Sequence, residues 1–122
     1  MKIEVSNGEI LDKLSILEIK LKNIKDADKL IHITNEYNFL KDISTKIPYD
    51  VKRYEKLLNI NTTLWGIEDE IREKERNKEF DEKFIELARL VYITNDKRAS
   101  IKLEINNNTN SNFVEVKSYK EY

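Results

Sequence analysis

The stretch from Phe84 to Ile105, FIELARLVYITNDKRASIKLEI, decides the fold, because its apolar side chains recur at the spacing of one helix face. The apolar arc consists of Phe84, Leu87, Ala88, Val91, Ile101 and Ile105. The opposite side carries Glu86, Lys97 and Glu104, where solvent is expected. The pattern predicts a long amphipathic helix whose apolar face packs against other helices.

Polar residues interrupt the second half of this arc. Asn95, Arg98 and Lys102 fall inside it, and Arg89, Tyr92 and Asp96 flank it. Burying a charge is costly unless it is paired, so the pattern needs an explanation. In a structural interpretation, Arg98 pairs with a carboxylate on a facing helix and Lys102 extends past the end of the core. In a functional one, Asn95, Arg98 and Lys102 line a pocket for an anionic ligand.

The composition favours one helical domain. The chain has 122 residues, and its two glycines and one proline leave little material for the turns of a sandwich or barrel. Charged residues make up 37% with a net charge of −1, which argues against a nucleic-acid partner. The absence of cysteine and the single histidine argue against a metal site or another cofactor. Neither a signal peptide nor a membrane-spanning run is found, so we expect a cytoplasmic protein without a membrane partner.

Capping signals divide the chain into about four helices. Ser6-Asn7-Gly8-Glu9 has the form of a capping box, which predicts a first helix from Asn7 to about Lys25. The second is expected at about 27–46, the third at about 49–76 after Pro48, and the last from an Asp81 N-cap to about Asn106. We expect an antiparallel all-α bundle over residues 1–107, followed by a polar, flexible C-terminal tail at 108–122.

The middle of the third helix is poor helix material. Asn59-Ile60-Asn61-Thr62-Thr63 disfavours a helix interior, and Gly66 adds a further cost. We therefore expect this helix to be kinked or broken near 59–62. Trp65 is interpreted as a large core anchor.

The first helix is apolar on two sides. Its main stripe is accompanied by a second patch at Ile16 and Ile19, next to Asp12. Such a helix is either central in its own domain or buries its second face in another subunit. We expect the patch to be exposed and the protein to be a homodimer.

Two functions remain open from the sequence. The first is a cytoplasmic helical protein that binds a partner or a small ligand and forms a homo-oligomer. The alternative is a small enzyme or sensor for an anionic metabolite, with Tyr92, Asp96 or Glu68 as proton-handling groups; by fold analogy alone it is compared with helical chorismate mutases and helical nucleotide pyrophosphatases. Whether the protein is an enzyme stays open. The candidate ligand-binding residues are Arg98, Asn95, Arg89, Lys102, Tyr92, Asp96 and Glu68.

Three stretches carry a resemblance to a known family. They are Asn7–Lys20 (NGEILDKLSILEIK), Leu64–Glu73 (LWGIEDEIRE) and Phe84–Lys102 (FIELARLVYITNDKRASIK). With these the chain resembles a family of small, uncharacterised, all-helical bacterial and phage proteins with a domain of unknown function. The resemblance covers most of the chain except the second helix and the tail. It implies a stand-alone helical protein and assigns no activity or site residues.

Overall fold

The computed structural model describes residues 1–114 and confirms an all-helical fold. Its four helices are α1 (Asn7–Asn23), α2 (Ala27–Ser44), α3 (Val51–Arg76) and α4 (Glu82–Asn108). No strand occurs among residues 1–114. Residues 115–122, in the predicted tail, lie outside the described residues.

Each helix begins at a polar N-cap. The Ser6 Oγ accepts from the Glu9 backbone N–H at 3.2 Å, and Asp81 Oδ1 accepts from the Phe84 N–H at 3.0 Å, so both predicted caps are confirmed. Asp50 caps α3 by accepting from the Lys52 N–H. The helix therefore begins at Val51, and Pro48 lies in the preceding connection rather than in the first turn of α3.

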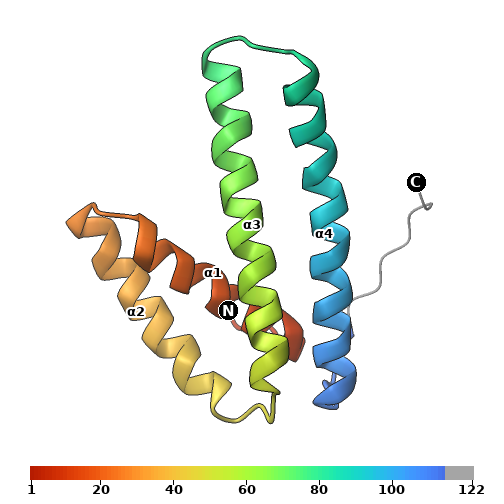
Figure 1. Ribbon diagram of the computed structural model, residues 1–122. Coiled ribbons are helices and arrows are strands. Elements are labelled where there is room, and N and C mark those ends of the chain that lie inside the picture. The colour runs from red at the N-terminus through yellow and green to blue at the C-terminus, as the bar shows by residue number, and fades with distance from the viewer. Residues whose placement is uncertain (115–122) are drawn as a thin grey trace.

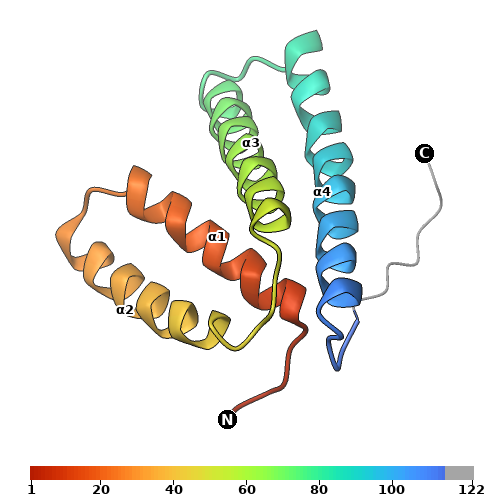
Figure 2. The same ribbon diagram turned by 60° about the horizontal axis from the view of Figure 1, so that its bottom comes forward.

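The helix that all others share is α1. It packs against α2, α3 and α4, whereas the only other pair of helices in contact is α3 with α4. Figures 1 and 2 show α1 and α2 side by side, with the start of α1 at the lower end of α4 and α2 on the outer side of α1. The upper turns of α3 and α4 extend beyond both. The two apolar sides of α1 follow from this central position: Leu14 and Leu17 are buried, and so is Ile19 of the second patch. The prediction that Ile19 is exposed is therefore wrong.

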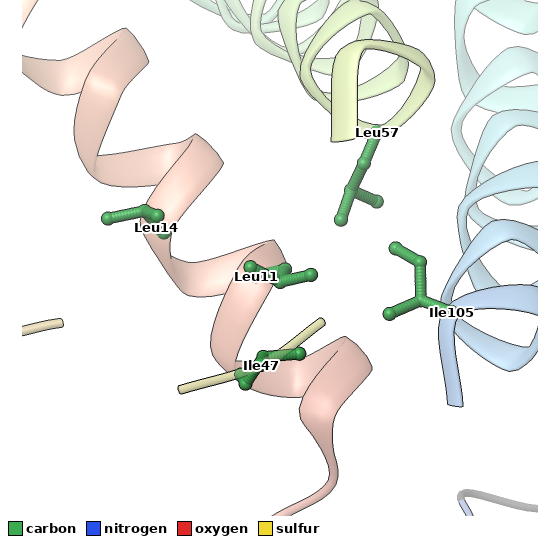
Figure 3. Close-up of a cluster of buried hydrophobic side chains, with 5 residues drawn as sticks. All are labelled: Leu11, Leu14, Ile47, Leu57 and Ile105. Carbon is green, nitrogen blue, oxygen red and sulfur yellow. The ribbon is translucent and has the colours of Figure 1, made fainter. Parts of the chain in front are cut away.

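The hydrophobic core lies where α1 meets the lower ends of the long helices. Figure 3 shows Leu57 from α3 and Ile105 from α4 near Leu11 of α1, with Ile47 of the α2–α3 connection beside them. Leu11 and Leu57 have no solvent exposure. Fully burying one such side chain contributes about 1.5–3 kcal/mol, so this cluster fixes the angle at which α1 crosses α3 and α4.

Helix α3 runs without interruption through the stretch that was expected to break. The hydroxyl groups of Thr62 and Thr63 donate to the carbonyl oxygens of Leu58 and Asn59, four residues earlier, at 2.8 and 3.0 Å. These polar side chains are thus satisfied inside a regular helix, which tertiary contacts with α1 and α4 stabilise. The predicted break at 59–62 is wrong, since α3 is one helix from Val51 to Arg76, while the alternative of a kink stays a prediction.

The N-terminus of α1 is capped by the end of α4 and the residues that follow it. The Gly8 N–H donates to Asn106 Oδ1 at 2.7 Å, and the Asn7 N–H donates to Ser111 Oγ at 2.9 Å. Asn7 Nδ2 also donates to Thr109, which is buried. These bonds satisfy backbone groups that a helix end leaves without partners. Residues 109–111 are consequently part of the folded domain.

A left-handed residue turns the chain at the end of α3. Lys78 has φ 53°, and the next N–H, that of Glu79, donates to the Lys74 carbonyl at 2.9 Å, as in a Schellman motif. The Lys74 Nζ donates to Asp81 and to Glu79, each at 3.0 Å, and these bonds, with Asp81 first, raise the pKa of Lys74. The loop thereby holds α3 and α4 together at their upper ends. Asn110, with the same φ, follows the end of α4.

Candidate functional site

A cleft of about 580 Å³ opens between α1, α3 and α4. It lies along α3, beginning beside the buried part of α1. A volume of this size is within the range of about 300–1,000 Å³ that is usual for small-molecule sites. The lining residues are Ile16 from α1, then Asn61, Leu64, Trp65, Glu68, Asp69 and Arg72 from α3, and Asn95 and Arg98 from α4.

A buried polar network lies at the lower end of the cleft. Asn61 Nδ2 donates to Asp12 Oδ1 at 2.9 Å and to Ser15 Oγ at 2.7 Å, and the Ser15 hydroxyl donates to the Asp12 carbonyl at 2.7 Å. All three residues are buried, with Ser15 fully so. Because buried polar groups are costly unless bonded, these contacts fix α1 against α3 in one register.

Arg98 is the cation nearest to this network. Its Nε lies 3.9 Å from Asp12 Oδ1, and its side chain is 31% exposed, against 5% for Asp12. Among the described residues this is its only polar contact. A guanidinium group carries several N–H donors in a planar fork, and one long contact leaves most of them without a protein acceptor. Arg98 therefore offers a fixed positive charge with donors available to a ligand.

The α3 side of the cleft combines an aromatic ring with charges of both signs. Trp65 is only partly buried and lines the cleft, so its interpretation as a core anchor is wrong. Glu68 and Arg72 form an ion pair, with Arg72 Nε 3.6 Å from Glu68 Oε2, and both side chains are largely exposed. Asp69 lines the same wall and makes no ion pair or hydrogen bond with the described residues.

The structure brings together three of the residues that the sequence analysis named. Arg98, Asn95 and Glu68 all line the cleft. Arg89 lies instead at a separate, smaller hollow beside Leu90. The residues that line the cleft do not include Tyr92, Asp96 and Lys102.

Lys102 is a structural cation. Its Nζ donates to Glu9 Oε2 at 2.7 Å, and its side chain is 8% exposed. The pair joins the first turn of α1 to the last third of α4, beside the bond from Gly8 to Asn106. Lys102 was expected to extend past the end of the core, but its charge is buried and is compensated by Glu9 on the facing helix.

Six lining residues were not among the candidates named from the sequence: Ile16, Asn61, Leu64, Trp65, Asp69 and Arg72. Ile16 was assigned to an exposed patch, Asn61 to the expected break in the third helix and Trp65 to the core, whereas the other three were given no role in a site. The spacing contained a usable signal: Asn61, Trp65, Asp69 and Arg72 recur at three or four residues, which is one face of α3. What the sequence lacked was the knowledge that α1 leaves this face uncovered.

A second polar contact links α1 to α3 outside the cleft. The Tyr54 hydroxyl donates to Glu18 Oε2 at 2.7 Å. Burial, and then the Glu18 carboxylate, raise the pKa of Tyr54 above its ordinary value. The phenol is thus held in its neutral, donating form.

Two features of the described residues bear on the kind of site. Residues 1–114 contain no group of three or more His, Cys, Asp or Glu side chains arranged to hold a metal ion. In the same part of the chain, every helix is too short or too polar to span a lipid bilayer.

The described residues form a small all-helical domain with an amphiphilic cleft along its two longest helices, α3 and α4. Residues 1–122 match the family of unknown function DUF6165, and the chain belongs to that family. No curated protein matches the chain, and no solved structure matches it.

Proposed function

We propose that this protein is a small-molecule-binding protein whose cleft takes an organic anion. The anionic group would contact Arg98 and Asn95, and the apolar part of the ligand would lie against Trp65. One observation supports this proposal above the others: Arg98 lies in a cleft with a single long polar contact among the described residues.

The contacts of Asp12 strengthen this argument. Asp12 Oδ1 accepts a hydrogen bond of 2.9 Å from Asn61, and Arg98 faces the same oxygen as its counter-charge at 3.9 Å. At 3.9 Å this ion pair has no direct hydrogen bond, so the guanidinium N–H donors of Arg98 are available to a ligand. A carboxylate or phosphate entering the cleft would instead accept two parallel N–H bonds from the guanidinium fork, which is the stronger arrangement.

The proposal is limited to binding because the proton-handling candidates are not gathered around Arg98. Glu68 is paired with Arg72 on the exposed α3 wall, and Tyr92 and Asp96 are not among the residues that line the cleft. The homodimer stays a prediction. The argument for it assumed that Ile19 is exposed, and Ile19 is buried within the chain.

The experiment is a thermal-shift titration with a panel of small anions: inorganic phosphate, nucleotides, and aliphatic and aromatic carboxylates. We expect at least one to raise the melting temperature, because a ligand that binds only the folded state stabilises it. Arg98→Met keeps much of the apolar stem and removes the donors, and it should weaken binding at least tenfold.

The matched control is Arg89→Met. It removes the same group from the same helix, outside the cleft, and should bind the ligand as the unmodified protein does. Circular dichroism would verify that both variants are folded. Binding that survives in Arg98→Met, or a panel without any response, would contradict the proposal.

A further inference from the structure

We infer that the ligand of this cleft is an elongated zwitterion, with an anionic group at one end, a cationic amine at the other and a flat or apolar segment between them. The inference rests on the proposed function, because it takes Arg98 as the site of the anionic group. It adds that the other end of the cleft, around Asp69, selects a positive charge.

The charges of the cleft argue against a ligand that is only an anion. Arg72 and Arg98 line it together with Glu68 and Asp69, and the buried Asp12 lies beside Arg98. The lining thus holds two guanidinium groups and two carboxylates; Arg72 is paired with Glu68, and Arg98 faces the buried Asp12. An anion large enough to fill the cleft would approach Asp69, whose carboxylate forms no ion pair with the described residues. A positive group at that end converts this repulsion into attraction.

The helix geometry separates the two ends of the cleft. Asn61 and Arg98 both contact Asp12 Oδ1, so they mark the same level of the molecule. Asp69 lies eight residues farther along α3, and at about 1.5 Å per residue the two levels are about 12 Å apart. Arginine and aspartate side chains reach some way into this interval. The ligand must therefore be extended, with its opposite charges at opposite ends.

The middle of the cleft fits the segment between these charges. Trp65 lies one helical turn above Asn61 and one turn below Asp69, and Leu64 and Ile16 provide apolar surface nearby. An indole ring attracts a flat group by stacking and an adjacent ammonium group by cation–π interaction. A carboxylate beside the ring strengthens the preference for a cation at that end.

The test uses three molecules with one skeleton: 4-(aminomethyl)benzoate, a zwitterion; 4-methylbenzoate, its anionic counterpart; and 4-methylbenzylamine, its cationic counterpart. The protein contains one tryptophan, and it lines the cleft. Its indole N–H resonance in a nitrogen-15 spectrum therefore reports binding at the site directly. We expect the zwitterion to bind at least tenfold more tightly than either counterpart.

Two variants separate the ends of the site. In Asp69→Asn, an exposed position where the fold should be unaffected, the advantage of the zwitterion over 4-methylbenzoate should disappear while binding of 4-methylbenzoate is retained. In Arg98→Met, binding of 4-methylbenzoate should be lost. Lys97→Met, an exposed change elsewhere on α4, should leave all three affinities unchanged.

The outcomes distinguish the inference from the proposed function. If 4-methylbenzoate binds as tightly as the zwitterion and loses affinity in Arg98→Met, the anion site stands and the inference is wrong. If the amine binds as tightly as the zwitterion and Arg98→Met has no effect, the proposed function is wrong as well. A zwitterion that leaves the indole resonance unmoved at millimolar concentration overturns the inference.

Discussion

Replacing Gly8 by alanine tests the packing of α1 against α4. A Cβ atom at Gly8 would lie 2.6 Å from the Lys102 carbonyl oxygen and 3.0 Å from Asn106 Oδ1. The first of these is a backbone atom within a long helix, so it cannot move without shifting α4. The substitution therefore forces the start of α1 away from α4 and stretches the bond from the Gly8 N–H to Asn106 Oδ1, now 2.7 Å.

The expected change in the free energy of unfolding of Gly8→Ala is the sum of three contributions. Overpacking of a single methyl group costs about 1–3 kcal/mol, and weakening a buried hydrogen bond costs about 1–3 kcal/mol. Alanine recovers at most about 1 kcal/mol through its higher helix propensity. We expect Gly8→Ala to lower the free energy of unfolding by about 3 kcal/mol. The matched control is Gly66→Ala, because a Cβ at Gly66 meets no atom within 4 Å. It should raise the free energy of unfolding by about 0.5–1 kcal/mol.

The assay is unfolding in urea, monitored by circular dichroism. The free energies of unfolding are compared between variants for which the slope against urea concentration is the same. The two glycines are the only ones in the chain, and both lie in helices. A decrease in the free energy of unfolding for Gly8→Ala together with an increase for Gly66→Ala would support the close approach of α1 and α4. A Gly8→Ala variant as stable as Gly66→Ala would refute the reasoning, since propensity would then be the only effect.

Three further changes test other parts of the structure. Lys78→Gly should raise the free energy of unfolding by about 1 kcal/mol, because a φ of 53° strains a side chain but not glycine; an unchanged urea midpoint would argue against this. Asn61→Ala should lower it by about 2–4 kcal/mol, because Asp12 and Ser15 lose their buried donor, and a melting temperature equal to that of the unmodified protein would contradict the network. Burial first and Glu18 second raise the pKa of Tyr54 above 10.0. The contribution of this phenol to the free energy of unfolding is therefore fully present below about pH 10 and is lost as the pH rises further. Tyr54→Phe should make the decline of stability above that pH shallower, and parallel pH profiles would count against the assignment.

Local rules predicted the helices closely. The N-caps at Ser6 and Asp81 depend on one side chain and a backbone N–H three residues away, so they are legible in the sequence. The predicted break in α3 is wrong because it was based on local propensity, whereas contacts with a distant helix decide the structure there. Helix propensity at 59–63 is weak, but Asn61 is held by Asp12 and Ser15 of a distant helix, and such contacts outweigh propensity.

The candidate site was predicted in part. Arg98 and Asn95 were recognisable because polar residues on an apolar helix face need an explanation. The sequence could not show that Lys102 is paired with Glu9, because that contact depends on where α1 crosses α4. It also could not show that Arg89 lies at a hollow outside the cleft. Trp65 was interpreted as a core anchor and Asp69 was given no role. Their spacing places them on one face of α3, but it does not show whether another helix covers that face.

The sequence alone therefore determined the helical class, the number of helices and most of their ends, because these depend on contacts within a few residues. Tertiary structure decided that α1 is the central helix, since its two apolar sides can be buried either within one chain or between two. It also decided which charges are compensated. Lys102 meets Glu9 at 2.7 Å and Arg98 meets Asp12 only at 3.9 Å, a difference set by the crossing of α1 over α4.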